Sequence, residues 1–135
     1  MKKWVYIIIG IIILIIIGIV IFRAGFGKNS NEDNWIKNSK GIYIKHGNPS
    51  QTPDYVKEQQ KAVLCAEDLY SKAKKHGLQF DSECIGECED YSIDIVHVPR
   101  TAADDNPENQ CESYPDVTPY FIELNKNGEI VKVAE

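Results

Sequence analysis

Cysteine is the residue type in this chain best suited to chemistry, and there are four: Cys65, Cys84, Cys88 and Cys111. Three residues separate Cys84 from Cys88, whereas a redox-active thiol pair normally has two intervening residues and begins a helix. Glutamates surround this pair, and their negative charge would raise the pKa of either thiol. We therefore expect structural disulfides, and a thiol-disulfide oxidoreductase at Cys84 and Cys88 is the alternative.

The pairing of these cysteines is limited by the reach of the chain. Four cysteines in a small domain that faces an oxidising compartment predict two disulfides, with three possible pairings. From Gly77 the chain needs about seven extended residues, at roughly 3.3 Å each, to run back along the ~18 Å of helix to Cys65. This distance favours Cys65 with Cys84 and Cys88 with Cys111. Cys88 could also reach Cys65, so the swapped pairing stays open.

Two kinds of metal site fit the same region less well. Structural zinc sites usually have two closely spaced pairs of ligands, whereas this chain has one closely spaced cysteine pair and two isolated cysteines. A zinc site would be the leading interpretation only if the domain were cytosolic. The acidic run 81–90 resembles a calcium-binding loop in one respect, because its sixth residue is a glycine. Ile85 nevertheless offers no oxygen at the fifth place, and Ser92 replaces the glutamate at the twelfth. We predict no metal ion and no other cofactor, and loose divalent binding stays open.

A second group of functional side chains follows a predicted strand: His97, Arg100, Asp104 and Asp105. A histidine at a strand end, an arginine and loop carboxylates could line a shallow anion site or a small hydrolase site, because loops on a scaffold carry such groups. Spacing alone identifies no nucleophile with a base and an orienting group. We expect Arg100 to pair with a loop carboxylate and His97 to be partly exposed, and we assign no catalytic residue.

The element that must position Cys65 is a helix predicted over 53–76. Asp54 faces its positive end, apolar residues recur near the 3.6-residue period, and Gly77 suits the left-handed residue after the last turn. Alternating apolar residues predict four strands, over 41–45, 91–98, 119–124 and 129–133.

The last two of these strands flank Asn125–Gly128 and form a hairpin. The proline-bearing run 99–118 is expected to be mostly loop, with one helical turn after Asn106. The predicted fold class is therefore α+β. One N-terminal transmembrane helix precedes a small domain in which one main helix packs on a largely antiparallel, disulfide-braced sheet.

The amino-terminal segment predicts a membrane anchor. Residues 4–22 carry no charge and eleven isoleucines. At 1.5 Å per residue they make a helix of roughly 28 Å, close to the ~30 Å hydrocarbon core of a bilayer. A cleaved signal peptide is shorter and ends in small residues, unlike Phe22. We expect a cytoplasmic leader at 1–3, a transmembrane signal anchor at 4–22, a flexible tether at 23–34 and an extracytoplasmic domain at 35–135.

The charged residues predict the orientation of the chain in the membrane and limit the kinds of partner that it could bind. Lys2 and Lys3 favour an inside amino terminus, which makes the chain a single-pass protein of the cell membrane with its domain outside. An inverted chain with a reduced cytosolic domain is the alternative. Residues 28–135 contain 12 Lys and Arg against 20 Asp and Glu, a formal net charge of −8. We therefore expect no nucleic-acid partner, and basic partners or divalent cations are compatible.

The sequence does not specify a molecular function. The interpretation that needs no catalytic residue is a binding or accessory module of an envelope assembly, held in the lipid bilayer through residues 4–22 with a possible protein partner in the envelope. Exposed tyrosines in one contiguous patch would mark the interface. The alternative is an extracytoplasmic enzyme, either the oxidoreductase or the hydrolase described above.

Overall fold

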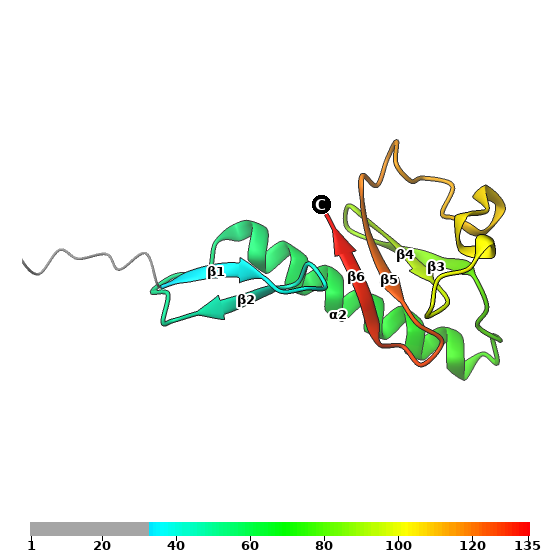
Figure 1. Ribbon diagram of the computed structural model, residues 1–135, viewed down its shortest axis with the longest axis horizontal. Helices are drawn as coiled ribbons and strands as arrows, with labels where there is room; N and C mark the ends of the chain where they lie inside the picture. The colour runs from blue at the N-terminus through cyan, green and yellow to red at the C-terminus, as the bar shows by residue number, and fades with distance from the viewer. Residues whose placement is uncertain (1–32) are drawn as a thin grey trace, which may run out of the picture. The chain divides into compact units, whose positions relative to one another are not determined.

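One long helix, α2 (Asp54–Lys75), organises the part of the chain that the computed structural model describes, residues 33–135 (Figure 1). It lies within one residue of its predicted bounds at each end. Asp54 in the first turn and three lysines in the last turn have the charges that the helix dipole favours. Gly77 has a φ of +79°, the left-handed conformation predicted for the residue that ends the helix.

The predicted anchor lies outside the described residues. The same is true of the leader at 1–3 and of nearly all of the tether at 23–34. Between residues 33 and 135, no helix is both long enough and apolar enough to cross a bilayer. The folded unit covers residues 34–135.

A four-stranded sheet packs on α2 in the order β3-β4-β5-β6. The strands are β3 (Glu83–Cys88), β4 (Tyr91–Ile95), β5 (Tyr120–Leu124) and β6 (Ile130–Ala134). The β4–β5 pair is parallel and the other two pairs are antiparallel, so the predicted α+β class with a mostly antiparallel sheet is confirmed. The predicted C-terminal hairpin is confirmed as β5 and β6. The strand predicted over 91–98 ends at Ile95, which leaves His97 outside the sheet.

Different parts of the chain pack on the two faces of this sheet. Alternate residues of β4, such as Ile93 and Ile95, are fully buried in the core with Ala62 and Ala66 of α2. The opposite face carries polar side chains and lies under residues 96–119. This connection contains two short 3-10 helices, at Ala102–Asp105 and Pro107–Asn109. The second of these is the predicted helical turn.

A separate two-stranded sheet forms at the start of the domain from β1 (Asn34–Lys37) and β2 (Tyr43–His46). Only the second of these strands was predicted, over 41–45. The buried side chain of Gln59 on α2 holds this hairpin. Its amide donates to the carbonyl of Gly41, at 3.0 Å, and its oxygen accepts from the N–H of Tyr43, at 2.8 Å.

Both predicted disulfides are present, but the favoured pairing is wrong. Cys65 of α2 is bonded to Cys88 at the end of β3, and Cys84 of β3 is bonded to Cys111 in the connection. The pairing that stayed open is therefore the one that forms. The chain leaves α2 and runs through β3 towards the start of the helix, so the later cysteine of the strand is the one that comes level with Cys65.

Candidate functional site

A cavity of about 390 Å³, lined by charged, polar and apolar side chains, lies between the outer face of the sheet and residues 96–119. Three charged side chains of its floor stand in direct register on neighbouring strands: Asp94 on β4, Glu123 on β5 and Lys132 on β6. We call these three residues the charged row. Residues that alternate along a strand point to one face, so the strands that bury Ile93 and Ile122 against α2 present the charged row to the cavity.

The connection supplies the walls and one cation of the cavity. Arg100 pairs with the buried carboxylate of Glu123 and, at 3.0 Å, with the carboxylate of Asp105. The predicted ion pair between Arg100 and a loop carboxylate is therefore confirmed, and Glu123 is an additional partner that was not predicted. Tyr114 and Phe121 also line the cavity and contact each other edge to face, with ring centroids 5.7 Å apart.

Asp94 differs from the other acids of the cavity, because no ion pair within residues 33–135 involves it. Burial raises the pKa of the Asp94 carboxyl to about 6, and the charge of neighbouring Glu123 adds to this increase. Arg100 and the backbone N–H of Cys111 lower that pKa by a smaller amount. Near neutral pH the floor therefore holds a partly buried carboxylate that forms no ion pair within residues 33–135, although Arg100 is close enough to act on its charge.

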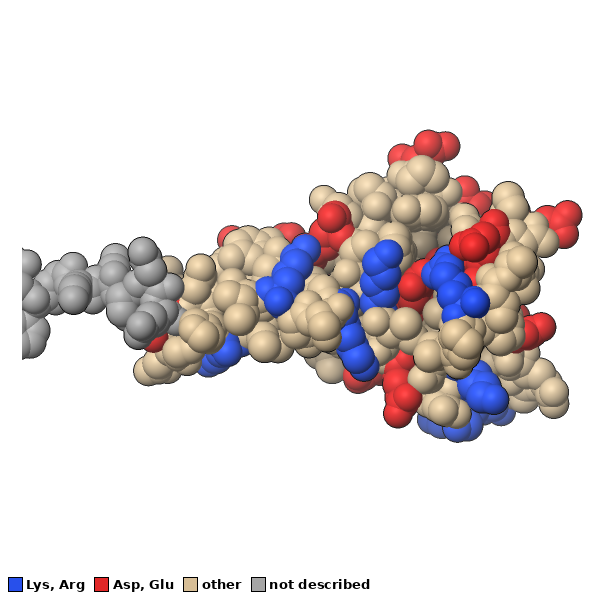
Figure 2. Space-filling view, in the orientation of Figure 1, with Lys and Arg blue, Asp and Glu red and all other residues tan. Residues whose placement is uncertain are grey.

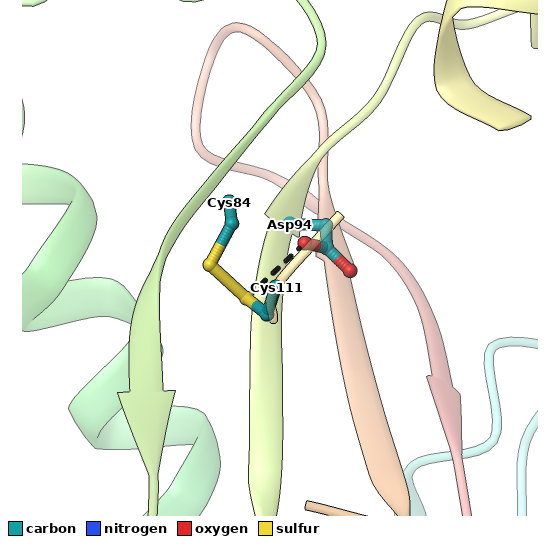
Figure 3. Close-up of side chains that lie close together, drawn as sticks. All are labelled: Cys84, Asp94 and Cys111. Carbon is teal, nitrogen blue, oxygen red and sulfur yellow. Dashed lines mark hydrogen bonds between the residues drawn. A yellow bond between two sulfur atoms is a disulfide. The ribbon is translucent and has the colours of Figure 1, made fainter. Parts of the chain in front are cut away.

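The Cys84–Cys111 disulfide lies beside Asp94, as Figure 3 shows. Sγ of Cys111 is 3.5 Å from Oδ1 of Asp94, and since a cystine sulfur carries no proton, this is a packing contact. Potential ligand atoms of Cys84, Asp94 and Cys111 lie within 4.8 Å of one another. Both sulfurs are bonded to each other, so neither is a thiolate that could ligate a metal ion.

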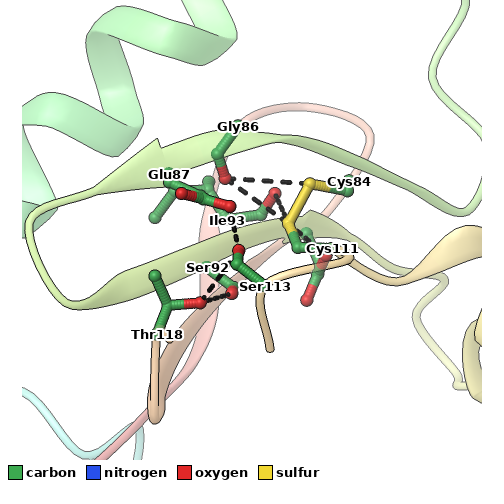
Figure 4. The surroundings of a disulfide bond; sticks show 9 residues. Cys84, Gly86, Glu87, Ser92, Ile93, Cys111, Ser113 and Thr118 are labelled. Atoms are coloured by element: carbon green, nitrogen blue, oxygen red, sulfur yellow. Dashed lines mark hydrogen bonds between the residues drawn. A yellow bond between two sulfur atoms is a disulfide. The ribbon is translucent and has the colours of Figure 1, made fainter. Parts of the chain in front are cut away.

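The same disulfide fastens the connection to the sheet (Figure 4). Nearby, the hydroxyl of Ser113 donates to the carboxylate of Glu87, and the hydroxyls of Ser92 and Thr118 are hydrogen bonded. The covalent bond and these hydrogen bonds cross from the sheet to residues 111–118. They hold the far wall of the cavity in place.

His97 belongs to a second cluster outside the charged row. Its Nδ1 is 3.0 Å from Oδ1 of buried Asp104, and its Nε2 is 2.7 Å from Oδ1 of exposed Asp81. The hydrogen bond with Asp104 raises the pKa of the imidazole, and partial burial opposes that increase. Both ring nitrogens therefore face carboxylates, which favours the imidazolium form.

Asp104 is the structural centre of this second cluster. Burial alone would raise its carboxyl pKa, but the backbone N–H groups of Thr101 and His97 hold the pKa well below its usual range. Asp104 also completes a capping box with Thr101 at the start of the first 3-10 helix. The cluster thus shapes the turn that delivers Arg100 to the cavity.

The geometry of His97 is not that of a hydrolase triad. In such a triad one ring nitrogen meets a carboxylate and the other meets a nucleophile. Here the hydroxyl of Thr101 is 3.2 Å from Nδ1, the nitrogen that already faces Asp104, and it lies 3.0 Å from Oδ2 of Asp104. Within residues 33–135, Nε2 faces a carboxylate oxygen of Asp81 rather than a nucleophile.

The candidate residues predicted from the sequence therefore divide into two clusters. His97 pairs with Asp104, Arg100 pairs with Asp105, and one hydrogen bond from Arg100 to the Asp104 carbonyl, at 3.2 Å, links them. Cys84 and Cys88 lie in different disulfides and are not bonded to each other, so this structure gives the oxidoreductase alternative no support. The charged row was not predicted, although Asp94 is an acid inside an otherwise apolar strand.

Comparisons with known proteins identify no relative. No protein-family model matches this chain, and no curated protein and no solved structure matches it either.

Proposed function

We propose that this chain is a membrane-anchored extracytoplasmic binding module, and that the cavity of the charged row receives a lysine or arginine side chain of a protein partner in the envelope. The observation that carries the proposal is Asp94, a partly buried carboxylate in the floor of the cavity that forms no ion pair within residues 33–135. An exposed domain with this acidic excess is compatible with a basic partner.

The chemistry of the cavity suits a cationic group. An ammonium or guanidinium group placed beside Asp94 would supply the charge that burial of this carboxylate leaves uncompensated. Aromatic faces attract cations: Nζ of Lys132 already lies 5.0 Å from the centroid of the Phe121 ring, and Tyr114 stands at the same cavity. The long apolar stem of a lysine or arginine side chain would pack against these rings.

An anionic ligand fits the cavity less well. The cavity has two cations of its own. The guanidinium group of Arg100 already bonds to Glu123 and Asp105, and Lys132 stands beside Glu123 with its Nζ over the ring of Phe121. An anion that displaced a carboxylate from Arg100, or that met Lys132, would also approach the negative charge of Glu123 or Asp94. The arrangement therefore favours a basic ligand over an acidic one.

Site-specific crosslinking of the full chain in its own membranes tests the proposal. A photoreactive residue replaces Gln110, which lines the cavity. Irradiation should join this position to an envelope protein next to a lysine or arginine residue, which peptide mass spectrometry would identify. The Asp94→Asn variant should give roughly tenfold less of this adduct, about the value of one charge-assisted contact.

Asp116→Asn is the matched control, because Asp116 is an exposed acid of the same connection outside the cavity lining. It should leave the yield of the adduct unchanged. The proposal is wrong if Gln110 crosslinks only to lipid or to another copy of the chain, or if the adduct forms equally well with Asn at position 94.

A further inference from the structure

A second cavity, of about 330 Å³, lies on the face of the sheet that packs on α2. Tyr91 at the start of β4 and Tyr120 at the start of β5 are cross-strand partners in its lining. Each lies two residues before a core isoleucine, Ile93 or Ile122, so this cavity and the charged row are on opposite faces of the sheet. We call it the tyrosine cavity. The rest of its lining comes from the first turns of α2, from the β3–β4 turn and from the end of β6, which lies beside that turn (Figure 1): Tyr55, Glu58, Lys61, Glu89, Asp90 and Glu135.

Three tyrosine rings bound the tyrosine cavity. Tyr91 and Tyr120 contact each other with ring centroids 5.3 Å apart, and Tyr55 on α2 has an exposed fraction of 46%. Four other aromatic rings of residues 33–135 have a lysine Nζ within 5.7 Å of the ring centroid. In the same part of the chain, no lysine or arginine lies over any of these three tyrosines. The cavity therefore presents aromatic surface that no cation of the described chain covers.

Carboxylates outnumber cations around these rings. The lining contains four acidic side chains and one basic side chain, that of Lys61. Glu135 forms an ion pair with Lys37, at 2.9 Å. The other three acids of the lining, and Lys61 itself, form no ion pair within residues 33–135. The lining thus has a net negative charge beside its aromatic surface.

The surrounding surface has the same sign of charge. Residues 54–135, which form α2, the four-stranded sheet and the connection, contain 8 Lys and Arg against 18 Asp and Glu. In Figure 2 the acidic side chains lie mainly over this part of the domain, away from the β1–β2 hairpin. Such a surface attracts cations and repels anions, so an anionic ligand does not suit the tyrosine cavity.

An alkylated ammonium group combines the two properties that this lining would recognise. Its positive charge suits the carboxylates, and its methyl groups pack against aromatic faces, as in the aromatic cages that bind quaternary ammonium ions. A metal ion suits the cavity less well, because within residues 33–135 no three metal-ligand atoms of this lining lie within 4.8 Å of one another. A neutral sugar would contact the rings but would gain nothing from the negative charge.

We propose that the tyrosine cavity binds an alkylated ammonium ion of the choline type, with its methyl groups against the rings of Tyr55 and Tyr120 and its charge beside the carboxylate of Glu58. Glu58 follows Tyr55 by three residues, so the two side chains are neighbours on the surface of α2. The same ammonium group occurs in free choline and in choline lipid headgroups. This site is separate from the charged row and requires no protein partner.

An amide chemical-shift titration of the full chain, in micelles of a polyoxyethylene detergent, tests the proposal. Choline should give saturable shifts at residues 89–91 and at Tyr120. The neutral analogue 3,3-dimethylbutan-1-ol, in which carbon replaces the nitrogen, should bind at least about tenfold more weakly. Equal affinity for the neutral analogue, or saturable shifts with N-acetylglucosamine instead of choline, would overturn the proposal. So would choline shifts centred on Asp94 and Glu123, because they would place the cation in the cavity of the charged row.

Matched variants separate the contributions of the rings and of the charge. Tyr55→Leu and Tyr120→Leu keep apolar bulk but remove an aromatic face, and each should weaken choline binding about two- to fivefold. Glu58→Gln should weaken it by a similar factor. Glu67→Gln, which changes an exposed acid of α2 outside this lining, should leave the affinity unchanged. Dispersed amide spectra show that each variant is folded, and unchanged affinity in both tyrosine variants would overturn the proposal.

Nanodiscs distinguish the two sources of the ammonium group. Shifts at residues 89–91 in phosphatidylcholine discs without added choline, and not in phosphatidylglycerol discs, would identify the lipid headgroup. Shifts in phosphatidylglycerol discs only after choline is added would identify a soluble ligand. The absence of shifts under both conditions would contradict the proposal.

Discussion

Replacing Asp94 by asparagine should stabilise the domain at neutral pH. Asparagine has nearly the shape of aspartate and can still accept the N–H of Cys111, but it carries no charge to bury. Burial raises the pKa of Asp94 from its ordinary value of 3.8 to about 6. At 1.36 kcal/mol per pH unit, this difference corresponds to at most about 3 kcal/mol of folding free energy. Since the side chain keeps some contact with water, we expect about 1–2 kcal/mol.

The sign of the pH dependence follows from the direction of the pKa. Because the carboxyl pKa is higher in the folded state, Asp94 favours folding fully below pH 3.8 and loses this contribution as the pH rises through about 6. The stability advantage of Asp94→Asn over the parent should therefore grow between pH 4 and pH 7. Above that range it should remain constant.

Urea unfolding at a series of pH values, with both disulfides intact, measures this difference. Comparing the variant with its parent cancels the contributions of the other titrating groups. Asp116→Asn, at an exposed position, should change the free energy of unfolding by no more than about 0.5 kcal/mol. A difference for Asp94→Asn that does not vary with pH, or a variant less stable than its parent at pH 7, would refute the claim that partial burial disfavours the charged form of Asp94.

Three further predictions concern the hairpin and the disulfides. Gln59→Ala should cost about 2–3 kcal/mol in urea unfolding because it strips two backbone groups of their partner, while exposed Gln60→Ala should be neutral. Gly41→Ala should lower the free energy of unfolding by at least ~2 kcal/mol in the same assay. The φ of Gly41 is +82°, and a new Cβ would lie 2.0 Å from the carbonyl oxygen of Val133. An unchanged urea midpoint would contradict this packing. Digestion with trypsin and a glutamate-specific protease should yield a Cys65–Cys88 peptide pair, and recovery of Cys65 with Cys84 would be the contrary result.

The helix and the C-terminal hairpin could be predicted because their signals are local. The apolar period of 53–76, the lysines of the last turn and Gly77 all act within a few residues of one another. The same is true of the loop at Asn125–Gly128, whose final glycine has a φ of +82° in the structure. Short-range patterns of this kind need no knowledge of the rest of the fold.

Strand β3 could not be predicted in this way. Residues 83–88 combine two glutamates, two cysteines and Gly86, so they show no apolar alternation. They form a strand because Cys65 and Cys111 hold them from both sides and because β4 pairs with them. These are tertiary constraints, and the choice between two disulfide pairings depends on the same constraints.

The charged row shows a similar limit for the site. Asp94 and Glu123 become neighbours only because β4 and β5 are parallel and in a particular register. The sequence identified Arg100 and Asp105 because their pairing is local. It could not show that Glu123 also pairs with Arg100 or that Asp94 forms no ion pair within residues 33–135, since both facts depend on strands that are distant in the chain.

The proposed anchoring and orientation are tested most directly by determining on which side of the membrane the domain lies. Two fusions to the carboxyl terminus of the full chain, through a linker after Glu135, would measure it: a phosphatase reporter that is active only in an oxidising outer compartment, and a fluorescent reporter that matures only in the cytosol. If the domain lies outside, the phosphatase should be active, the fluorescent fusion dark and all four cysteines protected from alkylation. A fluorescent fusion with alkylated cysteines would contradict this orientation.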